Sequence, residues 1–381
     1  MGKITFYCTI CAGPLHEWEL RKRSMLQPDE DVELCFDDDC DCDYDEDEDK
    51  GEEGEENSEA DLLKHDEYCN YRRGYWGDIL SERDIKWLSD ARMLGYIGPC
   101  NGVPLGALFQ WGLTESGSYD PYDGLILPGS DSGLWPNQDG YLVHHTCWQI
   151  LTLVHRSQHQ RPIHPHDVYL TMQSKLTHQN DIYLDWGDDR LYGGTEEFAE
   201  QEWLPVPGYE WLVTDPMKKI DFSELVMEST KVGADPGSLN GHAASTVSAD
   251  DPFGRLPTEI QHMILELLPS RSVVNLFLSS RAFRGAPNTL PRAFWRSRIY
   301  TDTPWILGTS LHGTISGESR RVNYKSLLRL LKHASARPVD GKNARFEAHL
   351  SLKNRRRIWA CCEGIVDIVD LWWNHQPIRK I

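Results

Sequence analysis

One stretch of the chain, residues 252–299, constrains the fold most, because it predicts three short helices within fewer than fifty residues. Pro257 suits the first turn of a helix, where its missing N–H would have no partner anyway. Glu259 then places a negative charge at the positive end of the helix dipole. Apolar residues recur behind it at helical spacing: Ile260, Met263, Ile264, Leu267 and Leu268. Pro269 follows and predicts that the first helix ends at Leu268.

The second and third helices of this stretch are also short and apolar. Ser272 can cap the second helix, which must be covered on two sides because its apolar residues do not share one face. Those residues are Val273, Val274, Leu276, Phe277 and Leu278. The third segment, residues 291–299, carries Phe294, Trp295 and Ile299. A unit this small rarely gains more than about 3 to 5 kcal/mol of net stability, so we expect it to share an apolar face with a partner.

The residues of this stretch resemble the F-box in order and spacing. The matching elements are Leu256-Pro257-x-Glu259-Ile260, Ile264, Leu267-Leu268, Val274-Asn275-Leu276, Ser280-Arg281 and Phe294-Trp295-Arg296-Ser297-Arg298. The resemblance implies that the helices bind the Skp-type adaptor of a cullin-based SCF ubiquitin ligase. The expected adaptor contacts are Leu256, Pro257, Ile260, Ile264, Leu267, Leu268 and Leu276, with Trp295 as a core anchor. The alternative is that these helices belong to an ordinary helical domain.

Two features depart from the F-box pattern. Ser270-Arg271-Ser272 stands between the first two helices, where many F-boxes have an acidic residue, so affinity for the adaptor could differ. F-box receptors also often carry leucine-rich repeats or a propeller after the F-box, and no repeat is found here. The sequence therefore does not indicate which region holds a target.

Two closely spaced pairs of cysteine and histidine, far apart in the sequence, predict a metal site. Cys8 and Cys11 are followed by a glycine and a proline, which oppose the helix of a thioredoxin-like motif. His144 and Cys147 supply the second pair. The two pairs provide the four donors of a tetrahedral zinc, and an insertion between them costs only about 0.6 kcal/mol per doubling of its length. We expect a structural zinc at Cys8, Cys11, His144 and Cys147. The alternative is a solvent-facing Cys8–Cys11 turn and a core helix that buries Cys147 and Trp148.

Charge is unevenly distributed along the chain. Residues 29–59 contain 19 Asp or Glu and a single Lys, a composition that cannot bury enough apolar surface to fold and predicts solvated disorder. From Gly254 onward 21 Lys or Arg stand against 9 Asp or Glu. These basic residues do not interleave with aromatics in a recognisable binding motif, so we do not expect nucleic acid as a partner.

The remaining segments predict both helices and strands. Apolar spacing predicts a helix over residues 84–94 and a buried helix over 147–154, whereas alternation over 181–186 predicts a strand. His155 and His159 are expected at a solvated helix end, and the run Arg355-Arg356-Arg357 is expected in a solvated turn. Near the C-terminus one helix is expected through Tyr324, Leu327, Leu328 and Leu331, and a last one with Leu352, Trp359, Cys362, Ile365, Val366 and Val369 on one side.

We therefore expect an α+β protein with an all-α F-box-like three-helix unit. The expected parts are a Cys-x-x-Cys knuckle at 1–28, an acidic disordered insertion at 29–59, a Trp-rich mixed region at 60–227 that packs with 1–28, a flexible linker at 228–251, the F-box at 252–299 and a C-terminal helical region at 300–381.

Shorter motifs extend the resemblance to fungal F-box proteins that begin with a Cys-x-x-Cys segment. These motifs are Cys8 to Cys11, His144 to Trp148, Trp211 to Pro216 and Asn354 to Trp359. The resemblance implies a non-catalytic receptor that brings an unknown protein target to a cullin ligase core. The alternative is a structural zinc-binding interaction protein with no role in ubiquitin ligation.

An enzyme is a third alternative, which the sequence favours least. The serine-hydrolase, zinc-protease and phosphate-loop motifs are missing, so we assign no catalytic residue. Cys147 beside His145 offers a thiol near a base, but sequence adjacency does not establish geometry. Because no signal peptide and no apolar run of membrane-spanning length are found, we expect a soluble cytoplasmic or nuclear protein with reduced thiols and no membrane partner.

Overall fold

The structure is a computed structural model of the 381-residue chain. It describes residues 7–15, 25–26, 75–76, 79–97, 110–114, 116–120, 124–127, 140–159, 161–175, 208–231, 251–284, 290–317, 322–337 and 349–375. The chain forms two compact units, of which the first is discontinuous: Met1–Pro216 joins Arg337–Ile381, and Met217–Ala336 is the second unit. The acidic run at 29–59 and the strand expected at 181–186 lie outside the described residues.

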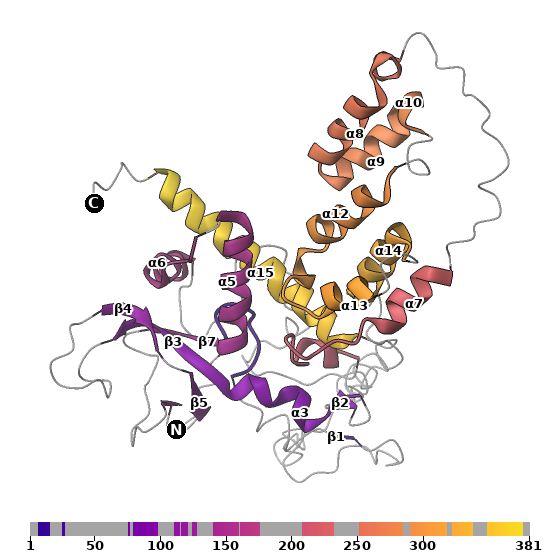
Figure 1. Ribbon diagram of the computed structural model, residues 1–381. Helices are drawn as coiled ribbons and strands as arrows, with labels where there is room; N and C mark the ends of the chain where they lie inside the picture. Colours follow the sequence, from indigo (N-terminus) through magenta and orange to yellow (C-terminus); the bar gives the residue numbers. More distant parts are fainter. Residues whose placement is uncertain are drawn as a thin grey trace, which may run out of the picture. The chain divides into compact units, whose positions relative to one another are not determined.

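A small antiparallel sheet is the framework of the first unit (Figure 1). Its strands are β3 (Asp90–Ile97), β4 (Gln110–Leu113), β5 (Gly117–Asp120), β6 (Gly124–Ile126) and β7 (Gly140–His144). β3 is central: one of its edges pairs with β7, the other is shared by β4 and β5, and β6 continues outward from β5. A separate parallel pair joins β1 (Met25–Leu26) to β2 (Tyr75–Trp76). Strands and helices therefore share this unit, as the α+β prediction requires.

The prediction of a helix over residues 84–94 is wrong beyond the first turns. Only α3 (Glu82–Ile85) and the 3₁₀ turn η1 (Lys86–Ser89) are helical, and β3 begins at Asp90. Met93 and Leu94 are buried in β3 and pair with Leu142 and Tyr141 of β7. Pairing on both edges of the strand therefore overrides the local helical spacing.

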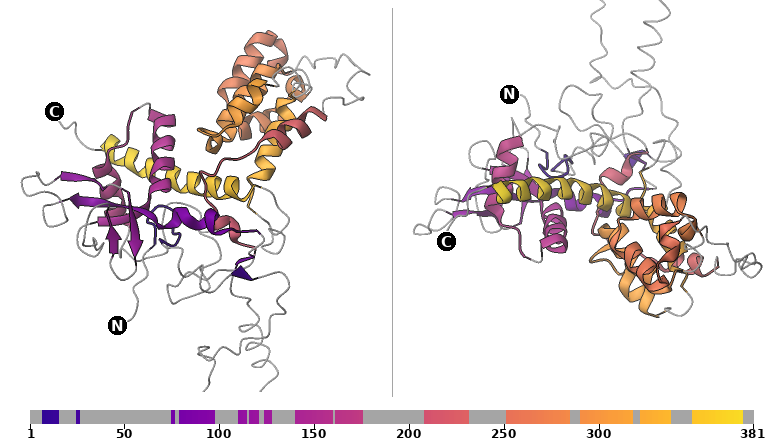
Figure 2. Two further views of the ribbon diagram at one scale, coloured as in Figure 1. Left: turned by 60° about the horizontal axis from the view of Figure 1, so that its bottom comes forward. Right: turned by 90° about the horizontal axis from the view of Figure 1, so that it is seen from above.

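Three helices complete the first unit: two contact the sheet, and the third packs against both of them. They are α5 (His145–His159), α6 (Pro165–Lys175) and α15 (Leu350–His375). α15 crosses α5, as the left view of Figure 2 shows, and it also contacts α6 and the 3₁₀ turn η5 (Glu210–Leu212). The buried helix expected over 147–154 is confirmed within α5, and the apolar side expected for the last helix is buried along α15.

Two groups of polar residues expected in solvent are buried instead. Arg355 and Arg357 lie inside α15 with their side chains covered, so the solvated turn expected there is wrong. His155 is also buried, its Nδ1 2.9 Å from the carbonyl oxygen of Arg161, and His159 Nε2 lies 2.9 Å from Asp370 Oδ2 on α15. The packing of α15 against α5 thus covers His155 and part of His159, whereas residues 156–158 of the same helix end are exposed as expected.

The second unit is helical throughout its described residues. Its longer helices are α7 (Ser223–Lys231), α8 (Thr258–Leu267), α9 (Ser270–Ser279), α12 (Arg292–Asp302) and α14 (Tyr324–Ala334). Shorter turns are η7 (Pro252–Arg255), α10 (Arg281–Arg284), η8 (Pro304–Ile306) and α13 (Leu311–Gly317). The three helices expected over 252–299 are α8, α9 and α12, and α8 ends before Pro269 as expected.

The two units divide the chain at other points than the sequence suggested. Residues 228–231, expected as the start of a linker, form the last turn of α7, which packs against α13 and α14. α15, expected to follow the F-box in one C-terminal region, belongs to the first unit. The second unit is thus an insertion in the sequence of the first.

The three F-box-like helices enclose a small core. It consists of Leu265, Val273, Phe283, Leu290 and Phe294, with Trp295 partly buried against it, as expected for an anchor. Leu265 is the one fully covered residue of α8, yet the helical spacing read from the sequence did not include it. The residues of the expected stripe instead occupy the flanks and outer face of the helix.

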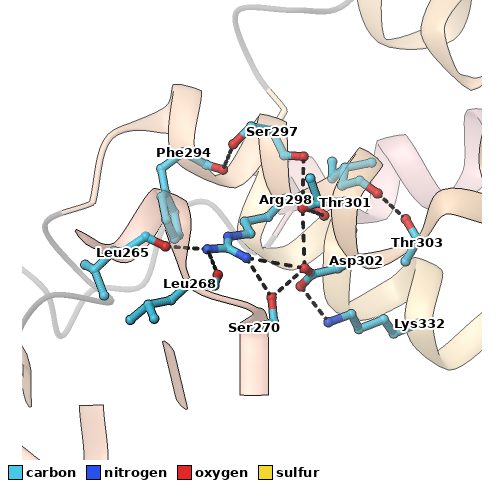
Figure 3. A network of polar contacts seen from close by, with 11 residues as sticks. Leu265, Leu268, Ser270, Phe294, Ser297, Arg298, Thr301, Asp302, Thr303 and Lys332 are labelled. Atoms are coloured by element: carbon cyan, nitrogen blue, oxygen red, sulfur yellow. Dashed lines mark hydrogen bonds and ion pairs between the residues drawn. The ribbon is translucent and has the colours of Figure 1, made fainter. Parts of the chain in front are cut away.

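A buried arginine ties the end of α8 to α12 (Figure 3). The Arg298 guanidinium donates to the carbonyl oxygens of Leu265 and Leu268, the latter at 2.6 Å, which provides partners for the orphan carbonyls at a helix C-terminus. Asp302 lies 3.7 Å from Arg298, accepts a hydrogen bond from Ser270 and pairs with Lys332 at 2.9 Å. α8, α9, α12 and α14 are therefore held together by one polar network as well as by their apolar core.

Within the described segments, no helix is long and apolar enough to span a membrane.

Candidate metal centre and apolar helical face

The structure brings the four predicted metal ligands together in the first unit. Cys8, Cys11, His144 and Cys147 are all buried, and their donor atoms lie within 4.8 Å of one another. His144 Nδ1 is 3.4 Å from Cys11 Sγ and 3.6 Å from Cys147 Sγ. A tetrahedral zinc with a Zn–S distance of about 2.3 Å and a Zn–N distance of about 2.0 Å separates sulfur and nitrogen by roughly 3.5 Å. The cluster can therefore hold a metal ion with little movement.

A tight turn presents the first two thiols. Ala12 N donates to Cys8 O at 2.8 Å, and Cys8 N donates to Gly13 O at 2.9 Å. Gly13 leaves room for the cluster, because a Cβ there would lie 3.3 Å from Cys11 Sγ, a tight contact, and 3.5 Å from a ring carbon of His144. The turn is attached to β7 by Thr9, whose N–H donates to Leu142 O at 3.0 Å. The turn expected from the sequence is thus present, but it is buried and not solvent-facing.

Backbone N–H groups point at the sulfur atoms. Gly13 N lies 3.4 Å from Cys11 Sγ, and His144 N lies 3.3 Å from Cys8 Sγ. Hydrogen bonds to sulfur favour the thiolate form, which is the form that binds metals. Cys147 lies in the first turn of α5, where the free N–H groups of the helix also favour negative charge.

The orientation of His144 selects Nδ1 as its ligand atom. Its Nε2 lies 2.8 Å from the carbonyl oxygen of Pro14, an acceptor that requires the proton on Nε2. The lone pair of Nδ1 is then directed at Cys11 and Cys147 in the neutral ring, and metal-binding histidines characteristically have such a hydrogen bond on the other nitrogen. Trp87 covers the ring, with centroids 4.5 Å apart, and its Nε1 donates to Val213 O at 2.8 Å.

The cluster also perturbs the acidity of its own members. Burial alone would lower the pKa of His144, but the charges of Cys8 and Cys11 and hydrogen bonds to them outweigh it and raise the pKa to about 10. Burial raises the pKa of Cys11, yet hydrogen bonds from Cys147 and Cys8 and the charge of His144 reverse the balance and lower it. Burial, with the neighbouring sulfurs, raises the pKa of Cys147. Close contact within the cluster thus shifts the pKa values of the buried thiols Cys11 and Cys147 in opposite directions.

Supporting residues of the cluster escaped the sequence analysis. Arg357 on α15 donates through Nη1 to the carbonyl oxygen of Cys11 at 2.7 Å, and Trp87 comes from the misassigned segment 84–94. The sequence held only a weak signal for Arg357: Ile365, which was expected on the buried side of the last helix, follows it at i+8.

The second unit presents the other candidate site, a set of exposed apolar residues on the consecutive helices α8 and α9. On α8 the exposed apolar residues Ile260, Met263 and Leu267 are spaced i, i+3 and i+7, and Leu267 is 82% exposed. On α9, Val274 and Leu278 are spaced i, i+4, and Leu278 is 74% exposed. We call these five residues the α8–α9 face. Large apolar side chains that are mostly exposed at helical spacing are typical of a surface that binds another protein.

The predicted adaptor contacts divide between this face and the core. Pro257, Ile260 and Leu267 are exposed, whereas Leu256 and Ile264 are partly buried. Leu268 and Leu276 are also partly buried and pack against the core of the three helices. The sequence analysis missed Met263, Val274 and Leu278 as contact candidates, although their apolar character in amphipathic helices was visible.

Comparisons with known proteins give no identity for the chain. No protein-family model, no curated protein and no solved structure matched it.

Proposed function

We propose that this chain is an F-box substrate receptor of an SCF-type ubiquitin ligase. The α8–α9 face is the observation that supports the proposal most, because it lies on the helices whose residues match the F-box in order and spacing. Each Leu, Ile or Val side chain gains roughly 1.5 to 3 kcal/mol when it is fully buried. Covering the five exposed side chains with an adaptor would therefore supply substantial binding free energy.

The proposed receptor needs no catalytic group of its own. The α8–α9 face would bind a Skp-type adaptor, other surfaces would bind the target protein, and the cullin core would supply the ubiquitin transfer. The Arg298 network fixes α8 against α12 before any partner arrives. Such preorganisation lowers the entropy lost on binding and so favours a stable complex.

Co-purification with a Skp-type adaptor tests the receptor proposal. We expect the full chain to co-elute with a co-expressed adaptor, and we expect an Ile260→Asp, Leu267→Asp double variant to elute alone. Met227→Asp is the matched control, since Met227 is an exposed apolar residue of α7 in the same unit but outside the proposed face. A folded wild-type chain that never binds the adaptor, or a Met227→Asp variant that loses binding equally, contradicts the proposal.

We further propose that the metal of the first unit is a structural zinc. Three thiolates and one imidazole suit zinc, and four protein ligands leave no open position for a substrate. Metal analysis of the purified full chain should find zinc, and Cys8→Ser should abolish its retention. The cluster also supports the alternative function, a zinc-binding interaction protein without a ligase role, which is the conclusion if zinc is found and the adaptor never binds.

A further inference from the structure

A buried cation from α15 reaches the candidate metal centre. The Arg357 side chain is only 3% exposed, and its Nη1 donates to the carbonyl oxygen of Cys11 at 2.7 Å. Its Nε donates to Asn354 Oδ1 at 3.1 Å, and Asn354 Nδ2 in turn donates to Thr214 O at 2.7 Å. The arginine is thus held by a neighbour on its own helix while it holds the metal-binding turn.

The hydrogen bond from Arg357 to the turn has a charged donor. Arginine keeps its proton even when buried, and two of the hydrogen bonds of Arg357 go to neutral acceptors, the Cys11 carbonyl oxygen and the Asn354 amide oxygen. Hydrogen bonds from an ionised donor are roughly twice as strong as those between neutral groups. The bond to Cys11 O therefore restrains the turn more firmly than one from a neutral side chain would.

Arg355 shows that an arginine of α15 can be buried without contacting the metal cluster. Its side chain is 1% exposed, and its Nη1 donates to Pro216 O at 3.2 Å. Ser351 likewise donates to the carbonyl oxygen of Asp215, at 2.6 Å. These contacts attach α15 to the 214–216 segment, whereas Arg357 contacts a metal-ligand residue.

We propose that Arg357 is a positioning residue of the metal centre, which fixes the Cys11 turn through its hydrogen bond to the Cys11 carbonyl oxygen. The proposal rests on the zinc site proposed above and adds that retention of the metal depends on the C-terminal helix. Residues that orient metal ligands in this way typically change metal affinity by about 10- to 100-fold when they are replaced.

Zinc transfer from the full chain to a chromophoric chelator tests the proposal. We expect Arg357→Gln to release zinc about 10- to 100-fold faster than the wild type, and Arg357→Lys, which keeps the charge, to fall between them. Arg355→Gln is the matched control: it removes an equally buried guanidinium and should lower the melting temperature without changing zinc release. The visible absorption of the cobalt-substituted protein should change in Arg357→Gln and not in Arg355→Gln.

The outcomes separate this inference from the zinc proposal. A wild-type chain that binds neither zinc nor cobalt overturns both the zinc proposal and the positioning role of Arg357. A wild type that retains zinc, with equal release from the Arg357→Gln and Arg355→Gln variants, leaves the zinc site intact but overturns the positioning role. If Arg357→Gln does not fold, Arg357→Lys decides, because release and a cobalt spectrum identical to wild type would show that the charge alone suffices and that the guanidinium contact with Cys11 does not position the turn.

Discussion

In a folded chain, charged groups usually lie in solvent and apolar side chains lie in the core. The metal cluster and the α8–α9 face depart from this rule in opposite ways. At the cluster, ionisable groups and a guanidinium are buried; on α8 and α9, large apolar side chains are exposed. The first arrangement costs desolvation free energy, and the second leaves apolar area in water. Binding would remove each cost, by a metal ion in the first case and, under the proposed function, by an apolar protein surface in the second. The two departures therefore suit two different kinds of ligand.

The largest effect that distinguishes the two regions is expected from Cys11→Ser. Structural zinc contributes an apparent binding free energy of about 10 kcal/mol or more in small zinc-binding peptides, so the variant should lose zinc and most of the stability of the first unit. Metal analysis and hydrogen exchange measure both effects. Adaptor binding through the α8–α9 face should persist, because that face belongs to the other unit.

Cys362→Ser is the control for that experiment. Cys362 is as completely buried as Cys11 but is not one of the four clustered residues. It should keep its zinc while losing about 1 to 3 kcal/mol for a buried hydroxyl. If Cys11→Ser retains zinc, Cys11 is not a metal ligand. If Cys11→Ser loses adaptor binding, the two regions do not act independently.

An intermediate effect is expected from Phe294→Ala in the core of the three helices. Phe294 is buried and lies against Leu265 and Val273, so its truncation should cost about 3 to 5 kcal/mol in the free energy of unfolding. Leu278→Ala, on the exposed side of α9, should change that free energy by less than about 0.5 kcal/mol and weaken adaptor binding instead. Urea denaturation and adaptor titration measure the two quantities. Equal destabilisation by both variants would mean that Leu278 packs in the core.

The smallest effect is expected from Asp251→Asn at the start of the F-box-like helices. Asp251 accepts hydrogen bonds from Ala282 N at 2.9 Å, Ser280 Oγ at 2.8 Å and Phe253 N at 3.0 Å, and these bonds lower its pKa. A carboxylate whose pKa is lowered by folding stabilises the folded state above its ordinary pKa, about 3.9, and loses that contribution as the pH falls. The stability difference between wild type and variant should therefore shrink on acidification. A difference that is constant with pH, measured by urea denaturation, would exclude this role for the carboxylate.

What the sequence predicts well is what neighbouring residues determine. The end of α8 follows from Pro269, and the turn at Cys8 and Cys11 follows from local spacing and the glycine after it. The metal cluster was predictable because zinc chemistry restricts which two pairs can combine, even across a long separation. On the second unit the same local reasoning found the helices but could not divide their apolar residues between core and surface, as Leu265 and Leu267 illustrate.

The errors arise where distant partners decide the environment. Met93 and Leu94 have helical spacing but take strand geometry from the neighbours of β3. Arg355 and Arg357 have the charge of a solvated surface, yet backbone carbonyls 139 and 346 residues away accept their hydrogen bonds. Neither partner is visible from the local sequence, since a carbonyl acceptor belongs to every residue.

The insertion of the second unit into the sequence of the first sets an order for synthesis on the ribosome. Cys11 and Arg357 are separated by 346 residues, and the whole of Met217–Ala336 is translated between them. At about 5 to 20 residues per second, roughly 20 to 70 s pass between the two ends of that contact. The F-box-like helices are synthesised completely during this interval, whereas α15, which contacts the Cys11 turn, is synthesised after them. The nascent chain would thus expose the α8–α9 face before the contact between Arg357 and the Cys11 turn can form.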